Sequence, residues 1–276
     1  MQFNSKRKSK FGIMKRHATS ADDVMWFEAS PCFMFHVSNA FEEVGPDGVT
    51  TIVVLGCRLP QFEMNFGDDA LEGQALYEWR FVLSQAAAPA ARAAGQPLPV
   101  AEERVILQTA ADFPQTNPLF QGKKHRYTYM AGNIPRTRRS AVNAPAGPLF
   151  DSVMKVDHSL VPADGPALQE GGGGDGSGAC QTIFLPEGVY CGETCFLASD
   201  RPGRNAAELD EDDGFLVTFA HDENNQTSWL LVFDAKTMDT TPVASFKLPN
   251  RVPYGFHALW VSDTEVTSST SVRAKL

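Results

Sequence analysis

Short runs of hydrophobic residues alternate with polar turns along most of the chain. The clearest runs are residues 49–57, 76–83, 215–219 and 229–233. β-Branched and aromatic side chains dominate them, which is typical of β-strands. Short strands at regular spacing, linked by tight turns, are also what one blade of a β-propeller needs. The pattern therefore predicts an all-β protein.

The N-terminal part of the pattern predicts two neighbouring strands. Residues 23–35 are rich in aromatic side chains, and residues 49–57 are β-branched and apolar. The sequence Gly-Pro-Asp-Gly at 45–48 lies between them and is a strong turn signal. We therefore expect the two runs to lie side by side.

Two segments of low complexity interrupt the strands. Residues 85–99 are rich in alanine and contain prolines, and residues 162–180 include a long run of glycines. Neither composition can bury a core, so we expect flexible insertions within one domain that spans residues 1–276. The glycine run has neither the lysine nor the following helix of a phosphate-binding loop.

The composition is that of a soluble globular protein. The chain has 276 residues, of which 43% are hydrophobic and 21% charged, so it can bury a substantial core. The formal net charge of −9 argues against a nucleic-acid partner, because such a surface needs a basic field. No run of about 18 apolar residues is present, and the sequence therefore predicts no membrane-spanning helix.

Basic residues and cysteines each allow several interpretations. A basic cluster near the start fits a targeting peptide, a nuclear signal or a solvated loop between strands, of which the loop is favoured. The five cysteines are an odd number, which favours free thiols. Cys191 and Cys195 have a spacing that zinc could use, but no second pair completes a four-ligand set. The basic cluster consists of Lys6, Arg7, Lys8, Lys10, Lys15 and Arg16.

Two histidines close apolar, aromatic stretches. His36 follows the run from Trp26, and His257 follows a run that contains Pro249, Pro253 and Gly255. Prolines restrict φ and aromatic rings exclude water, so these contexts hold an imidazole rigidly. A buried histidine with backbone partners is the simplest interpretation of either residue alone. A pair in similar settings also indicates metal ligands, although imidazole by itself does not identify the metal.

Both histidine stretches resemble segments of one family. Phe35-His36-Val-Ser-Asn-Ala-Phe-Glu-Glu43 is similar to the Phe-His-x-x-Asn-Ala-Trp-Glu-Glu segment of the carotenoid cleavage oxygenases, and Arg251-Val-Pro-Tyr-Gly-Phe-His257 resembles their C-terminal signature. Shorter matches lie at residues 11–14, 122–127, 192–196 and 212–223. The resemblance covers nearly the whole chain and is to the C-terminal half of the plant-type cleavage dioxygenases, including the 9-cis-epoxycarotenoid group.

The resemblance implies a fold and a chemistry. Members of this family are seven-bladed β-propellers that hold a non-haem Fe(II) with four histidines, and carboxylates support the imidazoles from behind. They add O2 across one C=C bond of a carotenoid or apocarotenoid and release two carbonyl products. We expect the C-terminal blades of such a propeller in this chain, Fe(II) as its cofactor and a carotenoid or apocarotenoid as its substrate.

Residue by residue, the resemblance assigns His36 and His257 as metal ligands, with Asp112 and Glu193 as supporting carboxylates. Asp112 stands where the family has glutamate. Its shorter side chain predicts a weakened contact or one through water, and the alternative role is that of a capping or turn aspartate. The other histidines do not complete the ligand set, because His17 and His158 are expected in polar loops and His125 and His221 match positions that the family does not use for iron.

In the family the first two iron ligands precede the region where this chain begins. The chain is therefore expected to be a fragment that binds iron weakly alone, because two histidine ligands are missing. It is also expected to be poorly soluble, because part of a propeller leaves sheet edges open and core residues exposed. The alternatives are a truncated, inactive propeller fragment acting in binding and an unrelated histidine-metal hydrolase. The family also implies a plastid location, with the cytoplasm as alternative, and peripheral membrane contact.

Overall fold

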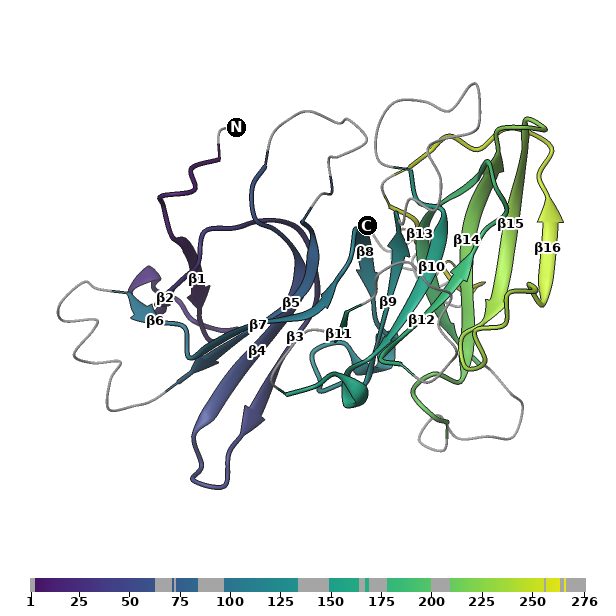
Figure 1. The fold of residues 1–276 in the computed structure, drawn as a ribbon. Helices are drawn as coiled ribbons and strands as arrows, with labels where there is room; N and C mark the ends of the chain where they lie inside the picture. Colours follow the sequence, from purple (N-terminus) through teal and green to yellow (C-terminus); the bar gives the residue numbers. More distant parts are fainter. Residues whose placement is uncertain are drawn as a thin grey trace, which may run out of the picture.

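The fold consists almost entirely of β-strands. The computed structural model describes residues 3–62, 71, 73–83, 97–133, 149–163, 167–168, 178–199, 209–255, 257–263 and 266. Four sheets follow one another across the molecule in chain order, from β1 at one end to β16 at the other (Figure 1). The prediction of an all-β protein is confirmed.

The first sheet is small and carries the N-terminal segment. It contains β1 (Ser9–Ile13), β2 (Met25–Ala29) and β6 (Leu98–Pro99), and the 3-10 helix η1 (Ala21–Asp23) precedes β2. β1 and β2 are antiparallel, whereas β6 is parallel to β2. The predicted basic loop therefore lies partly within a strand, since Lys10 belongs to β1.

The second sheet contains the hairpin that carries the first candidate histidine. Its order is β11-β7-β5-β4-β3, where β3 is Phe33–Val44, β4 is Thr50–Leu59, β5 is Ala75–Val82, β7 is Glu102–Gln108 and β11 is Ala167–Leu168. The turn between β3 and β4 closes at Gly48, whose φ of 76° favours glycine.

The prediction of one strand over residues 23–35 is wrong. The chain leaves β2 at Ala29 and enters β3 at Phe33, in a different sheet. Pro31 has no backbone N–H to continue a ladder, and the Cys32 N–H bonds to Ser9 Oγ at 3.1 Å. Within the predicted run, Phe33 and Met34 pair with β4.

The third and fourth sheets each have four strands. The third has the order β12-β10-β9-β8, with β8 at Ala111–Gln115, β9 at Tyr127–Gly132, β10 at Ser152–Asp157 and β12 at Cys180–Phe184. Two 3-10 helices, η2 (Pro118–Phe120) and η3 (His158–Leu160), flank β9 and β10 in the chain.

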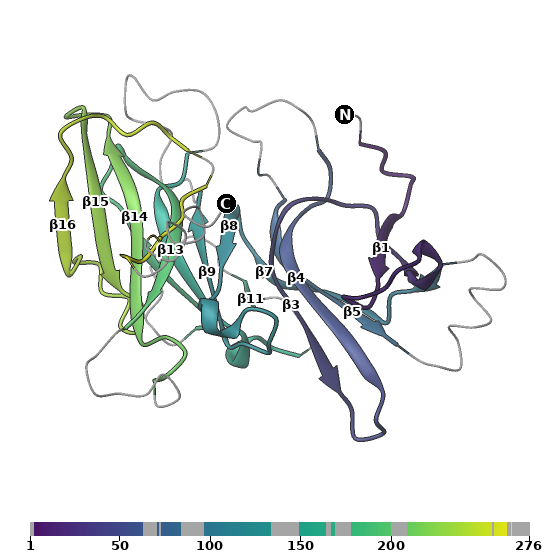
Figure 2. The same cartoon turned by 180° about the vertical axis from the view of Figure 1, so that it is seen from behind.

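The fourth sheet is an antiparallel meander of the kind that forms a propeller blade. Its strands are β13 (Val189–Ala198), β14 (Gly214–Asp222), β15 (Thr227–Asp234) and β16 (Ala244–Lys247), each paired with the next (Figure 2). The strands predicted at 215–219 and 229–233 are confirmed here.

Hydrophobic clusters hold successive sheets together. Phe27, Trp79 and Phe81 join the first sheet to the second, and Phe11 packs its ring 5.3 Å from Trp79. Leu55 and Leu76 of the second sheet share a cluster with Met130 and Met154 of the third. A third cluster, which includes Tyr129, Phe196, Leu216 and Phe233, joins the third sheet to the fourth.

The predicted insertions lie mainly outside the described residues. Within 85–99 the structure describes residues 97–99, and within 162–180 it describes 162–163, 167–168 and 178–180. The described parts include the short strands β6 and β11, which pair with β2 and β7. The part of the chain that the structure describes contains no helix long and apolar enough to cross a membrane.

Candidate metal centre

His36 projects from an irregular stretch of β3. The register with β4 shifts between Met34 and Val37 and again before Asn39. Such a bulge re-aims a side chain. Opposite the bulge, a Cβ on Gly56 would lie 2.9 Å from the His36 carbonyl oxygen and 2.6 Å from Met34 Sδ, so the close approach of β4 requires glycine.

Asp112 of β8 lies directly behind the His36 ring. Its Oδ1 atom is 2.9 Å from His36 Nδ1 and also accepts the Phe113 N–H at 2.8 Å. The Gln74 side chain donates to Oδ2 at 3.1 Å. Asp112 is buried, with 4% of its surface exposed. The carboxylate therefore has a hydrogen-bond donor on both oxygens.

This direct contact differs from the weakened contact expected for an aspartate. The backbone compensates for the missing methylene, because β8 changes register between Asp112 and Gln115. Phe113 within this irregularity has a φ of 54°, a left-handed conformation that few non-glycine residues adopt. With this irregular backbone the short side chain lies within hydrogen-bond distance of His36.

Glu193 of β13 has the same relation to His257. Its Oε2 atom lies 3.3 Å from His257 Nδ1 and accepts the Ala258 N–H at 2.7 Å. Its Oε1 atom accepts a 2.6 Å hydrogen bond from the Gln115 side chain. Each histidine thus has a buried carboxylate behind it, and each carboxylate has a glutamine amide behind it.

The two Nε2 atoms of His36 and His257 face each other at 3.3 Å. When each Nδ1–H is donated to its carboxylate, both Nε2 atoms present lone pairs to the same space. Two lone pairs at this distance repel unless a proton or a cation lies between them. Asp112 raises the pKa of His36, by the hydrogen bond first and by its charge second, so a shared proton is one solution.

A metal cation is the other solution, and the donor set fits one. Imidazole nitrogens bind first-row divalent metals at about 2.0–2.1 Å, so two ligands on one ion lie about 2.8–3.4 Å apart for angles between 90° and tetrahedral. Carboxylates behind the ligating rings are the usual support for such a site. Within the described ranges no group of three or more His, Cys, Asp or Glu side chains lies close enough together to hold an ion.

The Phe113 ring packs against both His36 and His257. Its ring centroid is 5.1 Å from that of His36 and 5.7 Å from that of His257, and the residue is 5% exposed. The ring covers both imidazoles on one side. On the other side the centre is open, since the His257 side chain is 63% exposed.

The remaining histidines do not join the pair. His125 and His158 both bond Thr128 Oγ1, at 3.3 and 2.9 Å. His221 lies within β14 and bonds Ser228 Oγ at 2.8 Å. The expectation that His158 lies in a polar loop is wrong, because His158 is the first residue of the 3-10 helix η3 and its side chain bonds inward to Thr128.

No sequence pattern indicated some residues of the centre. Gln74 and Gln115 belong to no motif, and Phe113 carries no sign of its positive φ. The two cysteines that zinc could have used bond to different groups, Cys191 to the Ser152 carbonyl and Cys195 to the Ala258 carbonyl.

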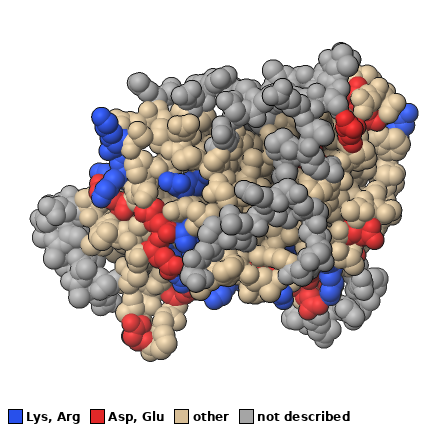
Figure 3. All heavy atoms as spheres, viewed as in Figure 1, with Lys and Arg blue, Asp and Glu red and all other residues tan. Residues whose placement is uncertain are grey.

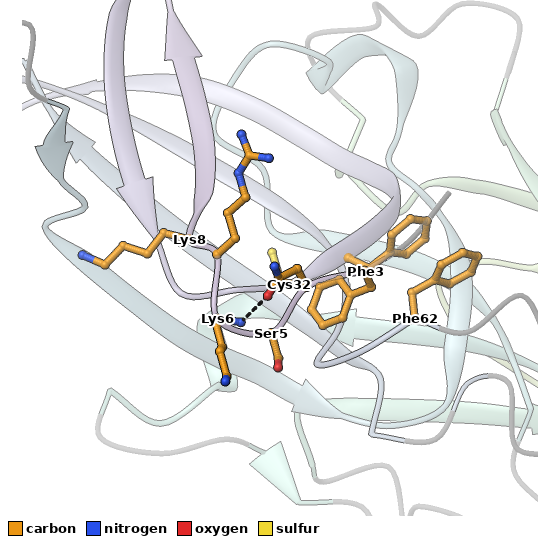
Figure 4. A pocket seen from close by; sticks show the side chains of 9 residues that line it. Phe3, Ser5, Lys6, Lys8, Cys32 and Phe62 are labelled. Carbon is orange, nitrogen blue, oxygen red and sulfur yellow. Dashed lines mark hydrogen bonds between the residues drawn. The ribbon is translucent and has the colours of Figure 1, made fainter.

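A cavity of about 760 Å³ opens beside the strand that carries His36. Its lining includes Lys6 and Lys8 on one side and Phe3 and Phe62 on the other, with Cys32 between them (Figure 4). On the surface around the sheets, acidic and basic side chains are interspersed (Figure 3).

Aromatic rings continue from this cavity towards the histidine. The Phe33 ring, which also lines the cavity, stacks on Phe62 at 3.9 Å, and Phe35 packs edge-on against both. The Phe35 ring centroid is 6.1 Å from that of His36. A planar apolar molecule could therefore lie along these rings with one end at the centre.

The chain is similar to several known proteins over nearly its whole length. The family model described as retinal pigment epithelial membrane protein matches residues 1–262. The chain is 34% identical over 282 residues to carotenoid 9,10(9',10')-cleavage dioxygenase 1 of Arabidopsis thaliana, covering 98% of the chain and 44% of the relative. It is 30% identical to the chloroplastic 9-cis-epoxycarotenoid dioxygenase NCED1 of Oryza sativa subsp. japonica, covering 94% and 34%.

Solved structures show the same fold. The apocarotenoid oxygenase of Synechocystis, as a Glu-to-Gln mutant, superimposes with a TM-score of 0.64 at 22% identity, covering 94% of the chain and 45% of that protein. The lignostilbene dioxygenase of Pseudomonas brassicacearum gives a TM-score of 0.68 at 18% identity, covering 93% and 47%. The chain thus spans less than half the length of these relatives.

Proposed function

Because the chain belongs to the carotenoid cleavage oxygenase family, we propose that it forms part of a non-haem Fe(II) dioxygenase that cleaves a C=C bond of a carotenoid or apocarotenoid. O2 is the co-substrate, and two carbonyl products result. The single observation that carries the proposal is the facing pair of His36 and His257, each backed by a buried carboxylate.

The residues of this chain have separate roles in the proposed site. His36 and His257 hold the iron through Nε2, and Fe(II) bound there supplies the open coordination chemistry that O2 requires. Asp112 and Glu193 fix the tautomer and orientation of the rings and offset positive charge. Phe113 excludes water from one side of both imidazoles.

The aromatic approach supports a conjugated, apolar substrate. Phe33, Phe35 and Phe62 form a continuous wall whose rings lie 3.9 to 5.5 Å apart. Such faces bind a flat polyene by dispersion over its whole length and impose little end-group selectivity. A plastid location is part of the proposal, because several relatives are named chloroplastic or chromoplastic.

A second candidate is a binding fragment without activity. It is favoured by the partial ligand set, since the described residues contribute two histidines to the centre. In this case the chain would bind an apocarotenoid along the aromatic wall without cleaving it.

Metal titration separates the two candidates. The purified chain is titrated anaerobically with Fe(II) and, as a spectroscopic probe, Co2+. The first proposal predicts that one ion binds each chain weakly, since two histidines alone hold it, and that a high metal concentration raises the unfolding temperature. Binding should be lost in His36→Ala and His257→Ala and unchanged in the control His17→Ala, which alters an exposed residue. The metal-loaded chain is then incubated with an apocarotenal under O2, and analysis of the products measures cleavage. Binding of the apocarotenal without metal uptake would favour the second candidate.

A further inference from the structure

His257 lies in a segment that has no regular secondary structure. After β16 ends at Lys247, the described residues 249–255 and 257–261 form no strand, whereas His36 belongs to β3. Leu259 is 85% exposed and Trp260 56% exposed, so burial does not fix the segment. Among the described residues, no backbone–backbone hydrogen bond joins 250–261 to a sheet. Side chains must therefore determine where His257 lies.

Glu193 makes the first of these attachments. Its Oε2 atom accepts from both the Ala258 N–H and His257 Nδ1. A carboxylate rotates easily about its last bond, so contacts to one oxygen alone do not fix its plane. The Gln115 amide supplies the missing restraint with a 2.6 Å hydrogen bond to Oε1. Gln115 belongs to β8 of the third sheet, whereas Glu193 belongs to β13 of the fourth sheet.

Cys195 makes the second attachment. It lies two residues beyond Glu193 in β13, and residues two apart in a strand point to the same face. Its Sγ donates to the Ala258 carbonyl oxygen at 3.2 Å, and the Trp260 N–H bonds to the same sulfur. Burial and the Glu193 charge raise the pKa of the Cys195 thiol, so it keeps the proton that it donates.

We propose that Gln115 and Cys195 are positioning residues that set the orientation of His257. Gln115 acts through the Glu193 carboxylate, and Cys195 acts through the peptide groups on either side of Leu259. Together they hold an exposed segment against β13 from two directions. The importance of this orientation for iron rests on the proposed function, but the orientation itself can be measured without metal.

The first test measures amide hydrogen exchange at Ala258 in the metal-free protein, with NMR as the method of detection. Gln115→Met removes the donor at similar volume, and Cys195→Ala removes the thiol. Each is expected to accelerate Ala258 exchange by up to about tenfold, the scale of one lost hydrogen bond. Cys195→Ser keeps a donor and is expected to stay within about twofold of the wild type. The 15N spectrum of the His257 ring should show the Nδ1–H tautomer in the wild type and a mixture in Gln115→Met.

Two matched controls alter the same residue types elsewhere. Cys180→Ala changes a buried cysteine of β12, and Gln121→Met changes an exposed glutamine beside η2. Both are expected to leave Ala258 exchange unchanged. Unchanged exchange in Gln115→Met and Cys195→Ala, equal acceleration in the controls, or failure of Cys195→Ser to restore protection would each overturn the assignment of the residue concerned.

Co2+ affinity provides the second readout. Gln115→Met and Cys195→Ala are expected to weaken binding about tenfold, the lower end of what supporting residues contribute. A wild-type chain that takes up no Co2+ would contradict the proposed iron site, whereas the exchange and tautomer measurements would still decide whether the two residues position His257.

Discussion

Asp112 Oδ1 lies 2.9 Å from His36 Nδ1, although an aspartate is one methylene shorter than the glutamate that the family resemblance implies at this place. The carboxylate is 4% exposed and also holds the Phe113 N–H. Asp112 therefore contacts both the His36 ring and the backbone of β8 at Phe113. Substitutions can separate the effect of its negative charge from the effect of its hydrogen bonds.

Asp112→Asn keeps an oxygen acceptor and removes the charge, whereas Asp112→Ala removes both. We expect Co2+ affinity to fall about tenfold in the first and up to about a hundredfold in the second, because supporting carboxylates orient the ring and raise its basicity. Isothermal titration with Co2+ measures this. Asp239→Asn, in an exposed turn, is the control and should bind as the wild type does. Wild-type affinity in Asp112→Ala would show that the contact does not support the site.

Phe113 should affect stability and metal binding together. Phe113→Ala removes a buried ring that contacts both histidines, and the loss of such a side chain costs about 3–5 kcal/mol of unfolding free energy. Urea unfolding measures the loss, and Co2+ titration reads the effect on the centre. Phe150→Ala is the control, since Phe150 is also buried and packs 5.3 Å from Phe113. Equal loss of Co2+ affinity in both variants would mean that general loosening, and not contact with the imidazoles, is responsible.

Lys155 should be required for the junction between the third and fourth sheets. Its Nζ lies 2.7 Å from Asp212 Oδ2 and 2.9 Å from the Ala235 carbonyl oxygen, and the residue is 3% exposed. Lys155→Met leaves the buried Asp212 charge unpaired, which costs about 3–5 kcal/mol. The free energy of unfolding in urea is the measurement.

The control for this ion pair is Lys236→Met, because the Lys236 side chain is 47% exposed and its amino group pairs with the exposed Asp210 and with Asp213. Exposed pairs contribute about 0–1 kcal/mol, so little change is expected. In Lys155→Met with Asp212→Asn the unpaired charge is gone, and part of the stability should return. A loss below about 1 kcal/mol in Lys155→Met would contradict the structural role of the pair.

Acid should destabilise the protein through His125 and His158. Burial lowers the pKa of His125 to about 4, and burial with the adjacent His125 lowers that of His158 to about 3. Between these values and about 6.5 the unfolded chain binds protons that the folded chain does not, so stability falls as the pH falls. The slope approaches about 1.4 kcal/mol per pH unit for each histidine.

Urea unfolding at pH 7 and pH 5 tests this pH dependence. His158→Gln should lose part of the difference between the two pH values, and the exposed His17→Gln should not. His36 has the opposite effect on stability, because Asp112 raises its pKa. The stability that His36 contributes is present at low pH and is lost as the pH rises through the raised pKa. The wild type and the variants share this contribution, so it cancels when their pH differences are compared. An identical pH difference in His158→Gln would exclude the pair as the cause.

The sequence by itself determined the class of fold, the family and the two histidines. Alternation of apolar and polar residues is a local property of strands, and it located β4, β5, β14 and β15. The aromatic stretches that end at His36 and His257 are likewise local features, but the predicted exclusion of water is wrong for His257, whose side chain is 63% exposed. The roles of His36, His257, Asp112 and Glu193 at a metal remain predictions that the experiments above address.

Only the tertiary structure decided how these residues meet. His36 and His257 are 221 positions apart in the chain, and nothing local indicates that their Nε2 atoms face each other. The contact of Asp112 depends on a register shift and on the positive φ of Phe113, which arise from pairing with β9 and packing against both histidines. Gln74 and Gln115 acquire their roles through single side-chain hydrogen bonds across the fold, which leave no pattern in the sequence.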